Sequence, residues 1–271
     1  METRTRYAAV LLMALWIVFT TQAFGSPIDI LDTFDSRNDA AWTHLEPLAS
    51  SGAPGTFSFP NGAYRIQASK SPDPTTLGPA RAGSLRYDTH VGIFNITIDL
   101  VGFDANLNQS FGLLGRVTSP GFGTTSGYAL TYSTAGSINL SSFQGEQMTL
   151  LDSVPAILDP THVNRFTLAG FQTGVAGVVR DLDNQTGGGV SAADVTHPLG
   201  LTGLFVMSNV GDGTADATVD NYHAVLNVPE PSTWSFLTAG AIVFGLAFRR
   251  KAAHSQEQQR KYSLRPSTLN H

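Results

Sequence analysis

Apolar and polar residues alternate in short stretches throughout the middle of the chain. The clearest stretch is Phe94–Leu100, which reads FNITIDL. A period of two puts the apolar side chains on one face of an extended strand and the polar ones on the other, whereas an amphipathic helix needs a period of 3.6 residues. We find no convincing helical period between Pro27 and Asn227. Further alternating stretches are Ala63–Ala68, Ser84–Asp88, Phe111–Val117, Tyr128–Tyr132, Ser137–Phe143, Gln147–Leu151, Arg165–Phe171, Val175–Arg180, Leu201–Met207 and Ala215–Asp220.

These stretches predict an all-β fold. Roughly a dozen short strands within about 200 residues are typical of one two-sheet β-sandwich. Alternation of apolar and polar residues favours antiparallel pairing, because the strands of a parallel sheet are buried on both faces and need crossover helices. The 27 glycines and 14 prolines among the 271 residues supply the many turns that such a fold requires. We therefore expect residues 26–227 to form a single antiparallel β-sandwich domain.

The N-terminus has the pattern of an export signal. Arg4 and Arg6 precede Tyr7–Phe19, an uncharged and mostly apolar run that is short for a membrane span but typical of a signal peptide. Ala23 and Gly25 are small residues, as signal peptidase requires before its cut. The pattern predicts that residues 1–25 are a signal peptide handled by the export machinery and signal peptidase. An uncleaved N-terminal anchor is the alternative.

The C-terminus carries a second apolar run between two polar motifs. The run Ser235–Phe248 follows Pro229-Glu230-Pro231 and is followed at once by Arg249-Arg250-Lys251. About 15 residues in a helix cover roughly 22 Å, less than the roughly 30 Å of a hydrocarbon core. We expect one short transmembrane helix within residues 228–251, with its basic end in the cytoplasm and the β-sandwich outside. A simple tail anchor has the same pattern.

The order and spacing of these C-terminal motifs resemble the PEP-CTERM sorting signal of exported bacterial proteins. The resemblance implies that an exosortase, a membrane enzyme, processes the chain near Pro229, Glu230 and Pro231. It also implies delivery to the cell envelope or to the extracellular polysaccharide matrix. Residues 252–271 depart from the family pattern, because family members usually end soon after the basic cluster. This polar tail is predicted to be disordered.

The body resembles the concanavalin A-like, or laminin G-like, jelly roll. The resemblance rests on Leu31–Asp35 followed by Ala41-Trp42, on Phe59–Ile66, on the hairpin around Asn164–Asp181, and on Val219–Tyr222 as a closing strand near the N-terminus. It implies a possible structural Ca²⁺ where the first and last strands meet, at Asp32 and Asp220. Ordinary surface carboxylates are the alternative at both positions.

The charge of the body argues against nucleic acid as a partner. Between Ser26 and Val228 there are eight Lys and Arg against eighteen Asp and Glu, which leaves a net charge of −10. Phosphate backbones bind basic surfaces and would be repelled by this acidic body.

Catalytic patterns are missing from the sequence. There is no cysteine, and the histidines are scattered without metal-site spacing. Glycosidases need two nearby carboxylates, yet Glu46 and Glu146 each stand alone. Asp216 and Asp220 share a strand face and suggest a carboxylate pair, but the solvated outer face of a strand has the same pattern. Gly187–Gly189 is interpreted as a flexible hairpin tip and not as an anion site. We therefore expect no enzyme activity.

Aromatic residues near one loop suggest where a sugar would bind. Phe122 lies in a glycine-rich loop, and exposed loop aromatics are often binding residues. Tyr128 and Tyr132 could extend that surface, although their alternation with Leu130 also fits a core strand. Trp42 is expected in the core.

The sequence thus predicts an exported, non-catalytic β-sandwich at the envelope or in the matrix that binds polysaccharide. A glycan-active enzyme on the same fold and a purely structural surface protein are the alternatives.

Overall fold

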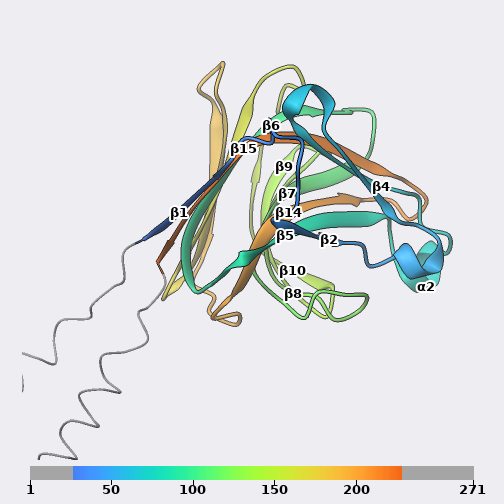
Figure 1. Cartoon of the computed structure of the whole chain (residues 1–271), viewed down its shortest axis with the longest axis horizontal. Helices are drawn as coiled ribbons and strands as arrows, with labels where there is room; N and C mark the ends of the chain where they lie inside the picture. The colour runs from blue at the N-terminus through green and yellow to red at the C-terminus, as the bar shows by residue number, and fades with distance from the viewer. Residues whose placement is uncertain (1–26, 228–271) are drawn as a thin grey trace, which may run out of the picture. The chain divides into compact units, whose positions relative to one another are not determined.

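Strands make up nearly all the regular structure of the computed structural model, which describes residues 27–227 (Figure 1). Every strand pair is antiparallel, and the strands form two sheets. The helical elements within 27–227 are a four-residue α-helix and two 3₁₀ turns. They are α2 (Pro74–Leu77), η1 (Ala49–Ser51) and η2 (Pro60–Gly62). No helix in this range is long and apolar enough to span a bilayer.

The larger sheet has eight strands. In pairing order it contains β13 (Gly187–Ala192), β12 (Gly174–Asp181), β11 (Asn164–Phe171), β6 (Ile93–Phe103), β15 (Ala215–Asn227), β4 (Tyr64–Ala68) and β3 (Gly55–Ser58). The eighth strand, β1 (Ile28–Asp32), pairs with the second half of β15, while β4 pairs with its first half. The first and last strands are therefore neighbours, as the jelly-roll resemblance implies.

The smaller sheet has seven strands. In pairing order they are β10 (Gln147–Pro155), β9 (Ser137–Gln144), β8 (Ser126–Ser133), β7 (Gln109–Thr118), β14 (Gly200–Ser208), β5 (Arg81–Val91) and β2 (Trp42–Leu45). The predicted all-β, two-sheet antiparallel sandwich is confirmed.

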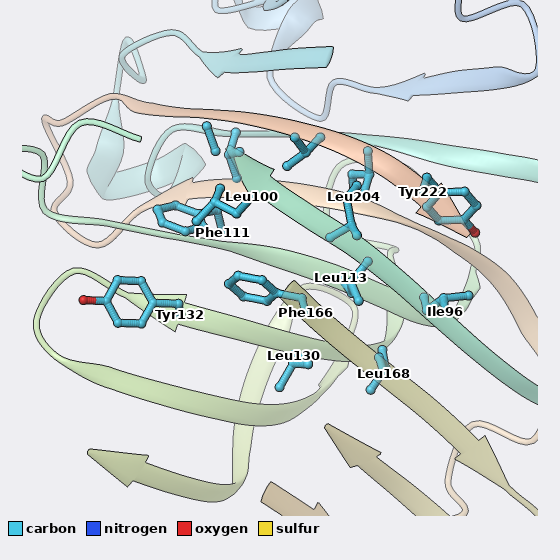
Figure 2. Packing of buried hydrophobic residues seen from close by; sticks show 14 of the residues in the cluster. Ile96, Leu100, Phe111, Leu113, Leu130, Tyr132, Phe166, Leu168, Leu204 and Tyr222 are labelled. Atoms are coloured by element: carbon cyan, nitrogen blue, oxygen red, sulfur yellow. The ribbon is translucent and has the colours of Figure 1, made fainter. Parts of the chain in front are cut away.

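The core lies between the sheets and follows from the period of two. On β6, Phe94, Ile96, Ile98 and Leu100 are all buried, while Asn95 is exposed. Apolar residues of the two sheets pack against one another in Figure 2, with the rings of Phe111 on β7 and Phe166 on β11 6.4 Å apart. Removing these side chains from water is the main source of stability, at roughly 25 cal/mol per Å² of apolar surface.

One turn assignment from the sequence is wrong. Gly187, Gly188 and Gly189 belong to the edge strand β13, and the hairpin turns earlier, over residues 182–186. A Cβ on Gly188 would lie 2.8 Å from Val154 of the opposite sheet. Gly188 therefore lets β13 pack closely against β10, so its role is close approach of strands and not turn flexibility.

The predicted signal peptide (1–25), the sorting motif with its transmembrane helix (228–251) and the polar tail (252–271) lie outside the described residues. The sorting-motif residues Pro229, Glu230, Pro231, Arg249, Arg250 and Lys251 are among them.

Candidate functional site

A second apolar cluster covers the outer face of the seven-stranded sheet. Leu113 of β7 points into the main core, whereas its neighbour Leu114 belongs to this outer cluster. The cluster's other buried members are Leu45, Leu85, Val117, Ala129 and Phe143. Outer strand faces are normally solvated, so a buried apolar cluster sets this face of the sheet apart.

A hollow opens beside this cluster. It is shallow and holds about 480 Å³ when the part open to solvent is counted. Its lining comes from β2, β5, β7, β8, β9, β10 and β14 and from adjoining loops, and it is mostly apolar. The lining residues are Leu45, Pro47, Arg81, Ala82, Leu114, Thr125, Ala129, Phe143, Glu146, Met148, Phe205 and Met207.

An ion pair closes one side of the hollow. The Arg81 guanidinium donates from Nε and Nη2 to the two carboxylate oxygens of Glu146, at 3.0 and 2.7 Å. Both side chains are largely buried. The remaining guanidinium nitrogen of Arg81, Nη1, donates to the carbonyls of Leu77 and Pro79. Bidentate pairs of this kind fix geometry as well as charge. Arg81 therefore holds the β9–β10 hairpin against the start of β5.

Glu146 also fixes the loop that carries Phe122. Its carboxylate accepts a hydrogen bond from the Gly123 backbone N–H at 2.7 Å. Glu146 itself has a positive φ of 66°, and Gly145 before it has 56°. A two-residue hairpin loop of this type requires positive φ at both central residues, which is uncommon for glutamate. The positive φ of Glu146 is therefore set by the hairpin turn between β9 and β10.

Phe122 lies over this ion pair and is open to solvent. Its side chain is 48% exposed, and its ring centroid is 5.6 Å from the Arg81 guanidinium carbon. The cation supports one face of the ring through a cation–π contact. Phe122 adjoins the hollow through its contact with Arg81, and Met148, which lines the hollow, is 42% exposed. The site thus presents an aromatic ring and an apolar floor to solvent.

The two tyrosines predicted to extend this surface are buried instead. Tyr128 is fully buried, and its hydroxyl donates to Asp194 and accepts from the His197 N–H. Tyr132 is 3% exposed and accepts from the Leu158 N–H. Both point into the space between the sheets, because they share the inward face of β8 with Leu130, so neither offers a ring to a ligand. Trp42 is buried, as expected.

Asp32 is occupied by other partners. Its Oδ2 accepts from Trp42 Nε1 at 2.9 Å and from Arg86 at 3.0 Å, and its Oδ1 accepts from the Phe34 N–H. Asp220 accepts from the Asn221 N–H, and burial raises its pKa. Within 27–227, Asp32 and Asp220 do not join a group of three clustered metal-ligand side chains. An arginine on Asp32 disfavours a cation there, so the residues do not fit the expected calcium site.

Asp216 and Asp220 lie on the outer face of the eight-stranded sheet. Arginines pair with Asp216 and with Asp99, the strand neighbour of Asp220. Asp216 forms a bidentate pair with Arg65. Asp220 lies opposite Asp99 in the strand register, and Asp99 is bound in turn by Arg165 at 2.7 and 2.9 Å. This arrangement agrees with a charged, half-solvated strand face.

Sequence reasoning missed one cluster. His162 Nδ1 lies 2.8 Å from the buried carboxylate of Asp181, and Asp183 is close enough that all three could contact one ion. The hydrogen bond that His162 donates to the Asp181 carboxylate raises the pKa of His162. The cluster joins a loop before β11 to the β12–β13 turn, so only the strand pairing brings it together. The same is true of Arg81 and Glu146.

Comparison with known proteins agrees with both the fold and the C-terminal motif. Residues 227–251 match the PEP-CTERM protein-sorting motif. No curated protein sequence is significantly similar to the chain.

Three solved structures illustrate the fold similarity. A prokaryotic β-1,3-1,4-glucanase (lichenase) derived from a mouse hindgut metagenome has a TM-score of 0.53 and 12% identity, with 74% of this chain and 99% of the other covered. Lectin UEA-II in complex with galactose has a TM-score of 0.51 and 11% identity, with 74% and 99% covered. The exoplasmic/lumenal domain of VIP36 in its Ca²⁺/Man3GlcNAc-bound form has a TM-score of 0.51 and 12% identity, with 76% and 94% covered.

At these identities the similarity shows the fold alone. The chain has the concanavalin A-like jelly-roll fold of these structures, and its residues 227–251 match the PEP-CTERM protein-sorting motif.

Proposed function

We propose that this exported protein binds a polysaccharide in the hollow on the outer face of its seven-stranded sheet, and that it does not hydrolyse it. The observation that carries the proposal is the half-exposed ring of Phe122, supported from behind by Arg81 beside an apolar floor. A sugar ring has an apolar face of C–H groups that packs on such an aromatic surface. The fold neighbours include a lectin complexed with galactose.

The carboxylates support binding in preference to catalysis. Glu146 is the one carboxylate among the residues that line the hollow, and both of its oxygens bind Arg81. Glycoside hydrolysis uses two carboxyl groups, one of them protonated. Both oxygens of Glu146 accept hydrogen bonds from Arg81, and one also accepts from the Gly123 N–H, so the carboxylate is engaged by the protein and is not turned toward a ligand. The lichenase neighbour makes hydrolysis the alternative outcome of the test.

The sorting motif indicates where the protein would act. It marks an exported protein that is processed at the membrane. An exosortase is the expected processing partner. A matrix-bound or envelope-bound glycan binder would meet extracellular polysaccharide directly after release, and the acidic body favours neutral glycans over highly acidic ones.

The test is a glycan array probed with the full chain in detergent, with and without chelator, followed by affinity measurements on any hit. Phe122→Ala should weaken binding about tenfold, since an aromatic contact of this kind contributes on the order of 1.4 kcal/mol. Phe171→Ala is the matched control, because Phe171 is 49% exposed but is the last residue of β11, in the other sheet. Equal losses in both variants, or release of reducing sugar by the unmodified chain, would contradict the proposal.

A further inference from the structure

Three loops meet at one end of the sandwich around a single buried arginine. Arg116 of β7 is 2% exposed, and its guanidinium donates to the carbonyl oxygens of Gly92, Phe171 and His197. One planar guanidinium spans only a few ångströms, so these carbonyls lie close together. The turn between β5 and β6, the turn between β11 and β12, and the 193–199 segment before β14 therefore form one surface.

Three large apolar side chains are exposed on this surface. Phe171, Val195 and Leu199 are 49%, 55% and 46% exposed, and all three lie on the loops that Arg116 joins. The three loops contain no lysine or arginine, and their one aspartate, Asp194, accepts from the buried Tyr128 hydroxyl. Grouped apolar side chains on an exposed end mark an interaction site more often than a stability feature. We call Phe171, Val195 and Leu199 the apolar end.

Both ends of the described chain lie at this same end of the sandwich. β15 finishes at Asn227, which pairs with Ile93 directly after the Gly92 turn, and β1 begins at Ile28 opposite Leu226. Figure 1 shows β1 beginning and β15 ending side by side at the lower left. The chain therefore leaves the sandwich beside the apolar end.

The sequence after Asn227 limits how far this end can be from a membrane. Residues 228–234 separate the end of β15 from the apolar run Ser235–Phe248. Seven residues span at most about 25 Å when fully extended. The opposite end of the sandwich is farther away by the length of a strand, about 30 Å for nine residues. The apolar end is therefore the part of the sandwich that is tethered nearest to a bilayer that receives the apolar run.

We propose that the apolar end docks on the lipid surface, placing Phe171, Val195 and Leu199 at the boundary between headgroups and acyl chains until the C-terminal segment is processed. The proposal rests on the membrane-processed sorting motif and not on glycan binding. A lipid partner is favoured over a protein because the tether brings this end to the bilayer in every copy of the chain. Contact comes from apolar insertion, because the loops carry no basic residue to attract anionic headgroups.

The chain has no cysteine, so single introduced cysteines can report the depth of chosen sites. We would reconstitute the full chain in phosphatidylethanolamine/phosphatidylglycerol vesicles with a nitroxide at Phe171→Cys, Val195→Cys or Leu199→Cys. Collision rates with oxygen, which concentrates in lipid, and with a water-soluble nickel chelate give the position of each label. Val210→Cys is the matched control, because Val210 is 38% exposed on the connection between β14 and β15 at the opposite end.

We expect the three labels at the apolar end to show a several-fold higher oxygen-to-nickel collision ratio than the label at Val210. Nickel access equal to that of Val210, or failure of the chain to float with the vesicles, would overturn the proposal. Low access to both reagents would also overturn it, since that result means burial against a protein. Unchanged unfolding midpoints confirm that the variants fold. Glycan affinity measured in detergent is independent of this result, so the two proposals can fail separately.

Discussion

Replacing Arg116 by methionine tests how the end of the sandwich is held together. Arg116 is buried and has a positive φ of 52°, within a register shift of β7. Its guanidinium makes four hydrogen bonds to three backbone carbonyls, and its carbon centre is 5.9 and 5.8 Å from the ring centroids of Phe94 and Tyr128. Within residues 27–227 no carboxylate forms an ion pair with it. Burial lowers its pKa, but an arginine remains charged.

The expected loss follows from those carbonyls. Methionine has a similar length and no donor, so Arg116→Met leaves three buried acceptors without a partner. Each costs about 1–3 kcal/mol. Folding of the variant no longer buries a charged guanidinium, and the absence of this desolvation cost offsets part of the lost stability. We therefore expect the lower end of the range, about 3 kcal/mol. With a urea dependence of about 2 kcal/mol per M, the unfolding midpoint should fall by about 1.5 M.

Urea unfolding followed by circular dichroism measures this shift, and Arg180→Met is the control because Arg180 is exposed on β12. Amide hydrogen exchange should accelerate in the turns at Gly92 and Phe171 and in the 193–199 segment before it does elsewhere. A midpoint within about 0.3 M of the control would refute the reasoning, since it would mean that water replaces the guanidinium at little cost.

Two further variants test local features of the fold. The hydrogen bond to Asp181 raises the pKa of His162 above 6.5. The stability that protonated His162 contributes is therefore complete below pH 6.5 and is lost as the pH rises through the raised pKa. His162→Gln should therefore lose more stability relative to the unmodified chain at pH 6 than at pH 9 in urea titrations, and an equal loss at both pH values would contradict this. Gly188→Ala should lower stability by about 1–3 kcal/mol through overpacking, because its Cβ would lie 2.8 Å from Val154. Gly189→Ala is the control, since its Cβ has no contact closer than 3.7 Å; equal midpoints in the two glycine variants would be the contrary result.

The candidate site was predictable in part. Phe122 follows from sequence, because a lone aromatic residue in a glycine-rich loop has few ways to be buried. The contact of the Phe122 ring with Arg81 could not be predicted from the sequence. Arg81 and Glu146 meet only when the β9–β10 hairpin reaches the start of β5. Tyr128 and Tyr132 show the opposite error. Tyr128 and Tyr132 share one strand face with Leu130, and the sequence left open whether this face points to solvent or to the core. Packing against the other sheet placed it in the core.

The sequence by itself determined the strand faces and the C-terminal sorting motif. Alternation is a local property, so the inward set on β6 could be predicted without any knowledge of its neighbours. Motif order along the chain is local as well. Tertiary structure alone decided which glycines allow close packing, which carboxylates are neutralised by arginines, and where the hollow opens. Those features depend on distances between residues far apart in sequence, and such distances are fixed only when the two sheets pack together.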